Sequence, residues 1–116
     1  YKKNVNFLKN VSQAGISEIL LFIEELKKRN NGFTDFIDFL RLWYRDICVI
    51  KLTKDIKNLI FVREESVILR LSREYTLQKI NSIIDLIDET QIRLKSNVSA
   101  ETVLELLLMG LRNRRE

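Results

Sequence analysis

Proline is absent from this chain of 116 residues, and glycine occurs only at Gly15, Gly32 and Gly110. These two residue types are the ones that most often end helices and shape turns. Their scarcity therefore favours helices joined by short turns. Apolar residues recur at intervals of three and four, and no alternation at every second position is long enough for a sheet. The sequence predicts an all-α fold, a single compact bundle of five to six helices.

Periodic apolar residues locate the first long helices. Between residues 17 and 29 they fall on one helical stripe, with Ser17 as the expected N-cap and residues 30–32 as a left-handed stop. A second helix is expected to begin after Thr34 as its cap and to run through about Lys51. Its expected buried side chains are Phe36, Phe39, Leu40, Trp43, Ile47 and Ile50.

The remaining segments are shorter or less sharply bounded. A polar connector at residues 54–58 separates the second helix from one expected within residues 63–73. Thr76 is expected to cap the next helix, and the last helix follows Ser99. The first dozen residues are expected to form one more helix or the end of a linker helix.

The sequence lacks several residue types and motifs that enzymes commonly use for catalysis. Histidine is absent, which removes imidazole bases and histidine-containing zinc sites. None of the glycines stands in a phosphate-binding loop pattern, so we expect no ATP site of that kind. The clustered carboxylates are best explained as a solvated surface. The sequence therefore predicts a non-catalytic domain with no cofactor and no bound metal.

Cys48 is the only cysteine, and its apolar helical context predicts a buried reduced thiol. This fits the reducing cytosol, so we expect a cytoplasmic protein. No apolar run approaches the roughly 18 residues that a membrane-spanning helix needs, and no membrane partner is expected. The net charge of +4 permits contact with nucleic acid without requiring it.

Arg45 and Asp46 form the most suggestive charged pair. Adjacent residues of a helix point about 100° apart, so we expect each of the two to find its partner elsewhere. Asp46 lies at the edge of the apolar face, where a carboxylate needs a hydrogen bond or a cation. We interpret Asp46 as a structural residue that ties the helix to a neighbouring turn or cation. Trp43 is interpreted as core, because helical spacing favours packing over stacking on nucleic-acid bases.

The last helix is apolar on so many sides that we expect it to be docked against something else. An apolar surface that remains uncovered after the bundle closes is typical of a partner site. The candidate partner-binding residues are therefore Val103, Leu104, Leu107, Leu108 and Leu111 of this helix, together with the charged Arg45 of the second predicted helix.

Two segments, residues 38–51 and 97–111, carry a resemblance to a known family. The first contains Leu-Trp-Tyr-Arg-Asp at residues 42–46, and the second opens with Asn-Val-Ser at residues 97–99 before a leucine-rich helix. Together they resemble the C-terminal helical domain of bacterial clamp-loader subunits, over residues 16–111. Asn97, read as a structural turn residue, favours the delta-prime branch of this family over the gamma/tau branch, whose corresponding turn usually contains proline.

The resemblance implies a collar domain. In clamp loaders such domains associate into a ring, beneath which ATPase-type domains open a sliding clamp for loading onto primed DNA. The expected partners are the C-terminal helical domains of the gamma/tau and delta subunits, with DNA bound only weakly or through the whole assembly. Because the chain begins Tyr-Lys-Lys without an initiator Met, residues 1–116 are expected to be one C-terminal oligomerisation domain of a longer protein. A gamma/tau domain and a basic helical DNA-binding module remain the alternatives.

Overall fold

The computed structural model describes residues 2–96 and 99–113 of the chain. Within those residues there are six α-helices, three short 3₁₀ helices and no strand, which confirms the predicted all-α bundle. The α-helices are α1 (Lys2–Lys9), α2 (Ile16–Lys27), α3 (Gly32–Thr53), α4 (Glu65–Glu74), α5 (Leu77–Leu94) and α6 (Ala100–Asn113). The 3₁₀ helices are η1 (Val11–Gln13), η2 (Ile56–Asn58) and η3 (Val62–Glu64).

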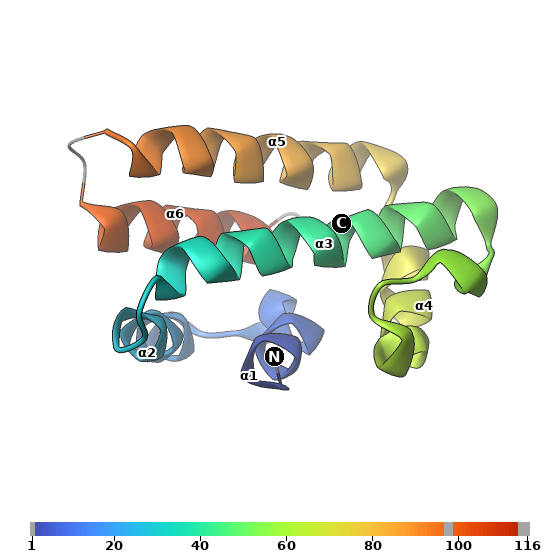
Figure 1. Ribbon diagram of the computed structural model, residues 1–116, viewed down its shortest axis with the longest axis horizontal. Helices are drawn as coiled ribbons and strands as arrows, with labels where there is room; N and C mark the ends of the chain where they lie inside the picture. The colour runs from blue at the N-terminus through green and yellow to red at the C-terminus, as the bar shows by residue number, and fades with distance from the viewer. Residues whose placement is uncertain (1, 97–98, 114–116) are drawn as a thin grey trace.

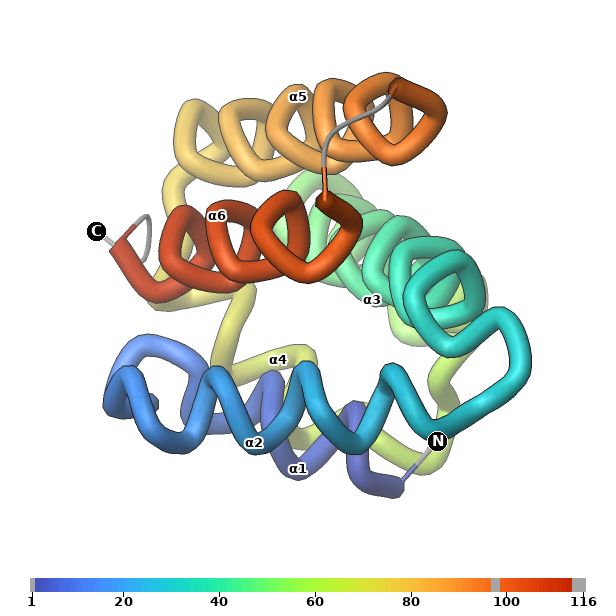
Figure 2. The backbone as a smooth tube through the Cα atoms, turned by 90° about the vertical axis from the view of Figure 1, so that its left-hand side faces the viewer, coloured from blue at the N-terminus to red at the C-terminus, as the bar shows by residue number. Residues whose placement is uncertain are grey.

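Helix α3 is the longest element and organises the bundle. It packs against α2, α4 and α5, while α6 packs against α5, α2 and η1. Figure 1 shows α5 and α6 running antiparallel above α2, and Figure 2 shows α6 between α5 and α2. Residues 54–64, which we call the connector, lead from the end of α3 through η2 and η3 to α4. None of the described helices combines the length and hydrophobicity that a membrane crossing requires.

The buried side chains of α3 follow the predicted helical period. Leu40, Trp43 and Ile47 are fully buried, and they recur at intervals of three and four, so they point to one side of the helix. They meet buried residues of α2, α4, α5 and α6 in one continuous hydrophobic core. This core holds α3 rigidly, so its exposed face is presented in a fixed orientation.

Two helices begin earlier than the sequence predicts. Helix α2 starts at Ile16 with Gly15 as its N-cap, so Ser17 lies inside the helix. Helix α3 starts at Gly32 after Asn31, whose backbone is left-handed, so Thr34 lies in the first turn and is not the cap. By contrast, Thr76 caps α5 as predicted, because its side-chain oxygen accepts a hydrogen bond from the N–H of Lys79 at 3.1 Å.

Gly32 has a steric reason for being glycine. A Cβ at this position would lie 1.9 Å from the carbonyl oxygen of Leu26, which is far inside van der Waals contact. The chain can therefore turn from α2 into α3 at this point only because the side chain is missing.

Candidate partner-binding surface

Asp46 anchors the connector to α3. Its carboxylate is fully buried and accepts hydrogen bonds from the backbone N–H groups of Ile60 at 2.9 Å and Phe61 at 2.8 Å. These two donors lie in the loop between η2 and η3, where no helix would satisfy them. Asp46 thus makes the contact with a neighbouring turn that its position at the edge of the apolar face favours.

Arg45 pairs with its own neighbour, and in this respect the sequence-based expectation is wrong. Its guanidinium Nη1 donates to Asp46 Oδ1 at 2.8 Å and to the carbonyl oxygen of Asn58 at 2.8 Å. The two side chains meet because the arginine is long enough to bend over the connector, toward which Asp46 points. The Arg45 side chain remains 43% exposed, so it forms part of the surface beside the connector.

Trp43 lies in the core, as its spacing predicts. Its ring is fully buried and meets Phe61 edge-on, with ring centroids 5.3 Å apart. Phe39 stacks against the same ring, with centroids 6.1 Å apart, and itself contacts Phe61 at 4.9 Å. A ring enclosed in this way cannot stack on a nucleic-acid base.

The five apolar residues predicted to form a partner surface on α6 are buried instead. Helix α6 is covered on both flanks by α5 and α2, so the sides that looked uncovered in the sequence face other helices of the same chain. The correction applies to Val103, Leu104, Leu107, Leu108 and Leu111, each no more than 2% exposed. A partner could reach these side chains only by opening the bundle. Asn97, the predicted turn residue, lies outside the described residues.

A first exposed apolar surface lies along α3 and the connector. Positions 42, 45, 49 and 52 of α3 follow intervals of three and four and therefore share the outward side of the helix. The connector adds further apolar side chains next to this stripe, because Asp46 and Arg45 hold it against α3. We define the connector surface as Leu42, Leu52, Ile56, Ile60 and Val62, which are between 42% and 69% exposed.

A second exposed apolar surface lies on α2 and α6. The two helices run antiparallel and are tied at both ends: Lys27 Nζ lies 2.5 Å from Glu101 Oε1, and Arg112 donates to the carbonyl oxygen of Ala14 at 3.4 Å. The hydrogen bond to Glu101 raises the pKa of Lys27 above its usual value. We define the α2–α6 surface as Ile16, Leu20, Leu21 and Leu106, all between 44% and 66% exposed.

The two surfaces lie toward opposite ends of α3. Figure 1 shows α2 at the left, beside the N-terminal end of α3, and the connector at the right, beside its C-terminal end.

Sequence reasoning missed both surfaces. The signal was present at positions 42, 49 and 52, which fall opposite the buried stripe of α3, and in the isoleucines that stand among polar residues of the connector.

Polar clusters elsewhere are engaged in structural contacts. On α5, Asp88 pairs with Arg41 of α3 at 2.6 Å, and Glu89 pairs with Arg93 at 2.5 Å. No group of three or more potential metal ligands occurs within residues 2–96 and 99–113. These carboxylates therefore act as cross-links of the surface, with Asp88 joining two helices.

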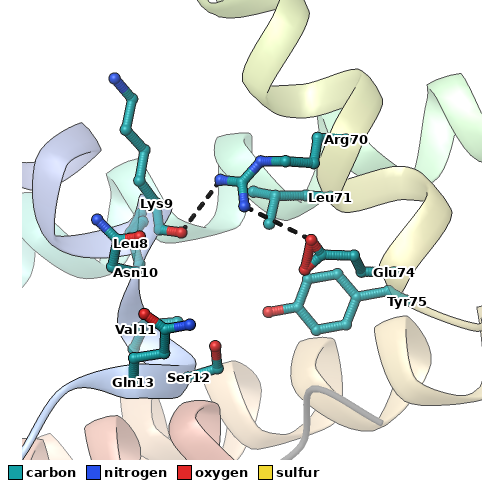
Figure 3. A pocket seen from close by; sticks show the side chains of 10 residues that line it. All are labelled: Leu8, Lys9, Asn10, Val11, Ser12, Gln13, Arg70, Leu71, Glu74 and Tyr75. Atoms are coloured by element: carbon teal, nitrogen blue, oxygen red, sulfur yellow. Dashed lines mark hydrogen bonds and ion pairs between the residues drawn. The ribbon is translucent and has the colours of Figure 1, made fainter.

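A small cavity between η1 and α4 is too tight for a ligand (Figure 3). Arg70 of α4 closes it by donating to the carbonyl oxygen of Lys9 at 3.2 Å while lying 3.5 Å from Glu74. The cavity has a volume of about 20 Å³, which is the room that one water molecule needs. The contacts of Arg70 fasten the N-terminal helix to the rest of the bundle.

Comparison with known proteins gives no match, whether to a family model, to a curated protein or to a solved structure.

Proposed function

We propose that this chain is a helical docking domain that joins two neighbouring subunits in a larger assembly. The observation that carries the proposal is the presence of two separate apolar surfaces, the connector surface and the α2–α6 surface, toward opposite ends of α3. Exposed apolar groups of this kind typically mark protein interaction sites.

Two different surfaces suit a ring better than a symmetric dimer. In a two-fold dimer both subunits use the same patch, whereas a subunit inside a ring contacts one neighbour with one patch and the next neighbour with another. A domain with two distinct apolar surfaces meets this requirement. The rigid core beneath α3 and α6 keeps the two surfaces at a fixed mutual orientation, which ring closure also requires.

The particular assembly that we propose is the collar of a bacterial clamp loader, with this chain as the C-terminal domain of the delta-prime subunit of DNA polymerase III. The support is the resemblance of residues 42–46 and 97–99 to that family, together with the role of Asp46. Asp46 resembles a residue that stabilises the fold of the collar domain in that family. Here the carboxylate of Asp46 fixes the connector to α3. The neighbours would be the C-terminal domains of the gamma/tau and delta subunits.

The role of the domain in this proposal is assembly. It would hold the subunit in the ring while the ATPase-type domains of the loader act on the sliding clamp. Delta-prime resembles an ATPase of this class but does not hydrolyse ATP. The assembly role therefore requires no catalytic residues in this chain.

The test mixes the purified domain with the gamma/tau and delta C-terminal domains at tens of micromolar and measures mass by light scattering. The unchanged domain should form heteromers with both. Leu52→Ser combined with Ile60→Ser should abolish binding of one partner, and Leu20→Ser combined with Leu21→Ser should abolish binding of the other. All four side chains are at least 44% exposed, so these variants should remain folded.

The matched control is Leu77→Ser combined with Ile92→Ser. These residues of α5 are 39% and 72% exposed and lie outside both surfaces, so their loss removes a similar apolar area and should leave both heteromers intact. Absence of any heteromer with the folded, unchanged domain would refute the proposal. Equal weakening by all three pairs would show that the two surfaces have no special role.

A further inference from the structure

A concavity of about 430 Å³ lies between the C-terminal turns of α3 and α4. It is far larger than the water-sized cavity beside η1, and one of its lining residues, Lys54, is the first residue of the connector. The C-terminal end of α3, where the connector begins, lies at the right of Figure 1. Its lining residues are Ile50, Lys51, Lys54, Leu69, Ser72 and Arg73. Three of these six carry a positive charge, and none of the described lining residues is acidic.

Two of the three positive charges are not engaged by the helix ends around them. Cations near a helix C-terminus often serve the last carbonyl groups, but here backbone N–H groups serve two of these carbonyls. The carbonyl of Ile50 accepts from the backbone N–H of Lys54 at 2.8 Å, and that of Leu71 accepts from the N–H of Tyr75 at 3.0 Å. Of the three cations, Lys51 alone is engaged in this way, because its ammonium group donates to the carbonyl oxygen of Ser72 at 3.0 Å.

Lys54 and Arg73 therefore line the concavity with their charges available. Both are exposed, and neither has a carboxylate partner among the described residues. The backbone of Lys54 adopts a left-handed conformation with φ 57° and closes the last turn of α3. The lining also includes two apolar side chains, the buried Ile50 and the partly buried Leu69.

We propose that this concavity binds phosphate groups of a single-stranded nucleic-acid backbone. The three cations supply the charge, and the apolar lining residues suit contact with a sugar rather than with a second charge. A free phosphate ion is the weaker fit, because exposed ammonium and guanidinium groups contribute little to binding one small anion in water. A strand gains affinity from several phosphates at once through release of its condensed counterions. The inference is independent of the docking surfaces, since none of their residues lines the concavity.

The test measures the binding of a fluorescent single-stranded oligonucleotide by anisotropy between about 50 and 200 mM salt, a range over which phosphate contacts change affinity strongly. Lys54→Asn combined with Arg73→Gln should weaken binding at least tenfold at the lowest salt. Each lost phosphate contact should reduce the slope of log K against log salt by about 0.7 for a single strand, so the pair should reduce it by about 1.4. Asparagine is chosen at position 54 because it tolerates the left-handed backbone.

The matched control is Arg29→Gln combined with Lys95→Gln. It removes the same charge from exposed residues that follow the last turns of α2 and α5, away from the concavity. This pair should change the affinity less than twofold. Arg73 does not have the left-handed backbone of Lys54. Arg73→Gln alone should therefore leave the fold intact and still lower the affinity, and it serves as the second variant if the double change unfolds the domain.

Three outcomes would overturn the inference. Equal losses from the two double variants would mean diffuse attraction to the whole surface. No binding by the unchanged domain at low salt would mean that there is no site. Displacement of the strand by millimolar inorganic phosphate at matched ionic strength would mean that the ligand is the free ion, whereas we expect no displacement.

Discussion

The carboxylate of Asp46 accepts the backbone N–H of Phe61 at 2.8 Å, across fifteen residues of sequence. The same carboxylate accepts from Ile60 and pairs with Arg45. One buried charge on α3 therefore determines where the connector runs, and with it where the exposed side chains of Ile60 and its neighbours lie. The candidate partner surface depends on this anchor although Asp46 is itself inaccessible.

Asp46→Ala should destabilise the domain much more than Arg45→Ala. Loss of Asp46 leaves two backbone N–H groups without an acceptor, at about 1–3 kcal/mol each, so we expect a loss of about 2–6 kcal/mol. Loss of the partly exposed Arg45 should cost about 1 kcal/mol or less, because water screens the pair. Urea unfolding followed by circular dichroism measures both changes. Similar losses in the two variants would contradict the anchoring role.

Sequence reasoning succeeded where local chemistry determines structure. Thr76 was identifiable as a cap because its hydroxyl can accept from a backbone N–H that the first turn of a helix leaves free, and the core stripe of α3 follows from spacing. It failed at the starts of α2 and α3, where backbone geometry at Gly15 and Asn31 takes precedence over the nearby Ser17 and Thr34.

The site was harder to predict than the fold because exposure depends on contacts between distant helices. Leu104 and Leu107 look uncovered in the sequence, yet α5 and α2 enclose them from both sides. Ile56 and Ile60 look like part of a polar loop, yet the anchor at Asp46 holds them together on the surface. Periodicity gives the direction of a side chain on its own helix and not the element that covers it.

Trp43→Ala should cost about 3–5 kcal/mol, as large aromatic truncations in a core do. Trp43→Phe should cost clearly less, because much of the apolar volume is kept and no hydrogen bond is lost: the indole N–H has no acceptor among the described residues. Thermal or urea unfolding of the two variants checks the order. A loss below about 1 kcal/mol for the alanine variant would be inconsistent with a core position.

Gly32→Ala should destabilise the domain, whereas Gly15→Ala should be tolerated. The new Cβ at position 32 would lie 1.9 Å from Leu26 O, while the nearest atom to a Cβ at position 15 is 3.8 Å away. Forced shifts of this kind typically cost about 1–3 kcal/mol, and the loss of a glycine N-cap should cost less than about 1 kcal/mol. Melting temperatures of the two variants provide the comparison, and equal values would argue against a close approach at Gly32.

Tyr44 should make the stability of the domain fall at alkaline pH. Burial raises the pKa of its hydroxyl well above the usual value of 10.0, and the neighbouring Tyr75 raises it further. A group whose pKa is higher in the folded state contributes stability that is fully present below the unfolded value and is lost as the pH rises above it. Above pH 10 the unfolded chain releases this proton and the folded chain keeps it. Stability should then fall by up to about 1.4 kcal/mol per pH unit from this one group.

Tyr44→Phe isolates the contribution of the Tyr44 hydroxyl. The phenyl ring keeps the edge-on contact with Tyr75, at a centroid distance of 6.0 Å, but cannot ionise. Its free energy of unfolding should therefore decline less steeply between pH 10 and about pH 12 than that of the unchanged domain, while other titrating groups affect both chains alike. Urea unfolding at a series of pH values measures the two slopes. Parallel slopes would show that Tyr44 titrates at the same pH whether the chain is folded or unfolded, contrary to its complete burial against Tyr75.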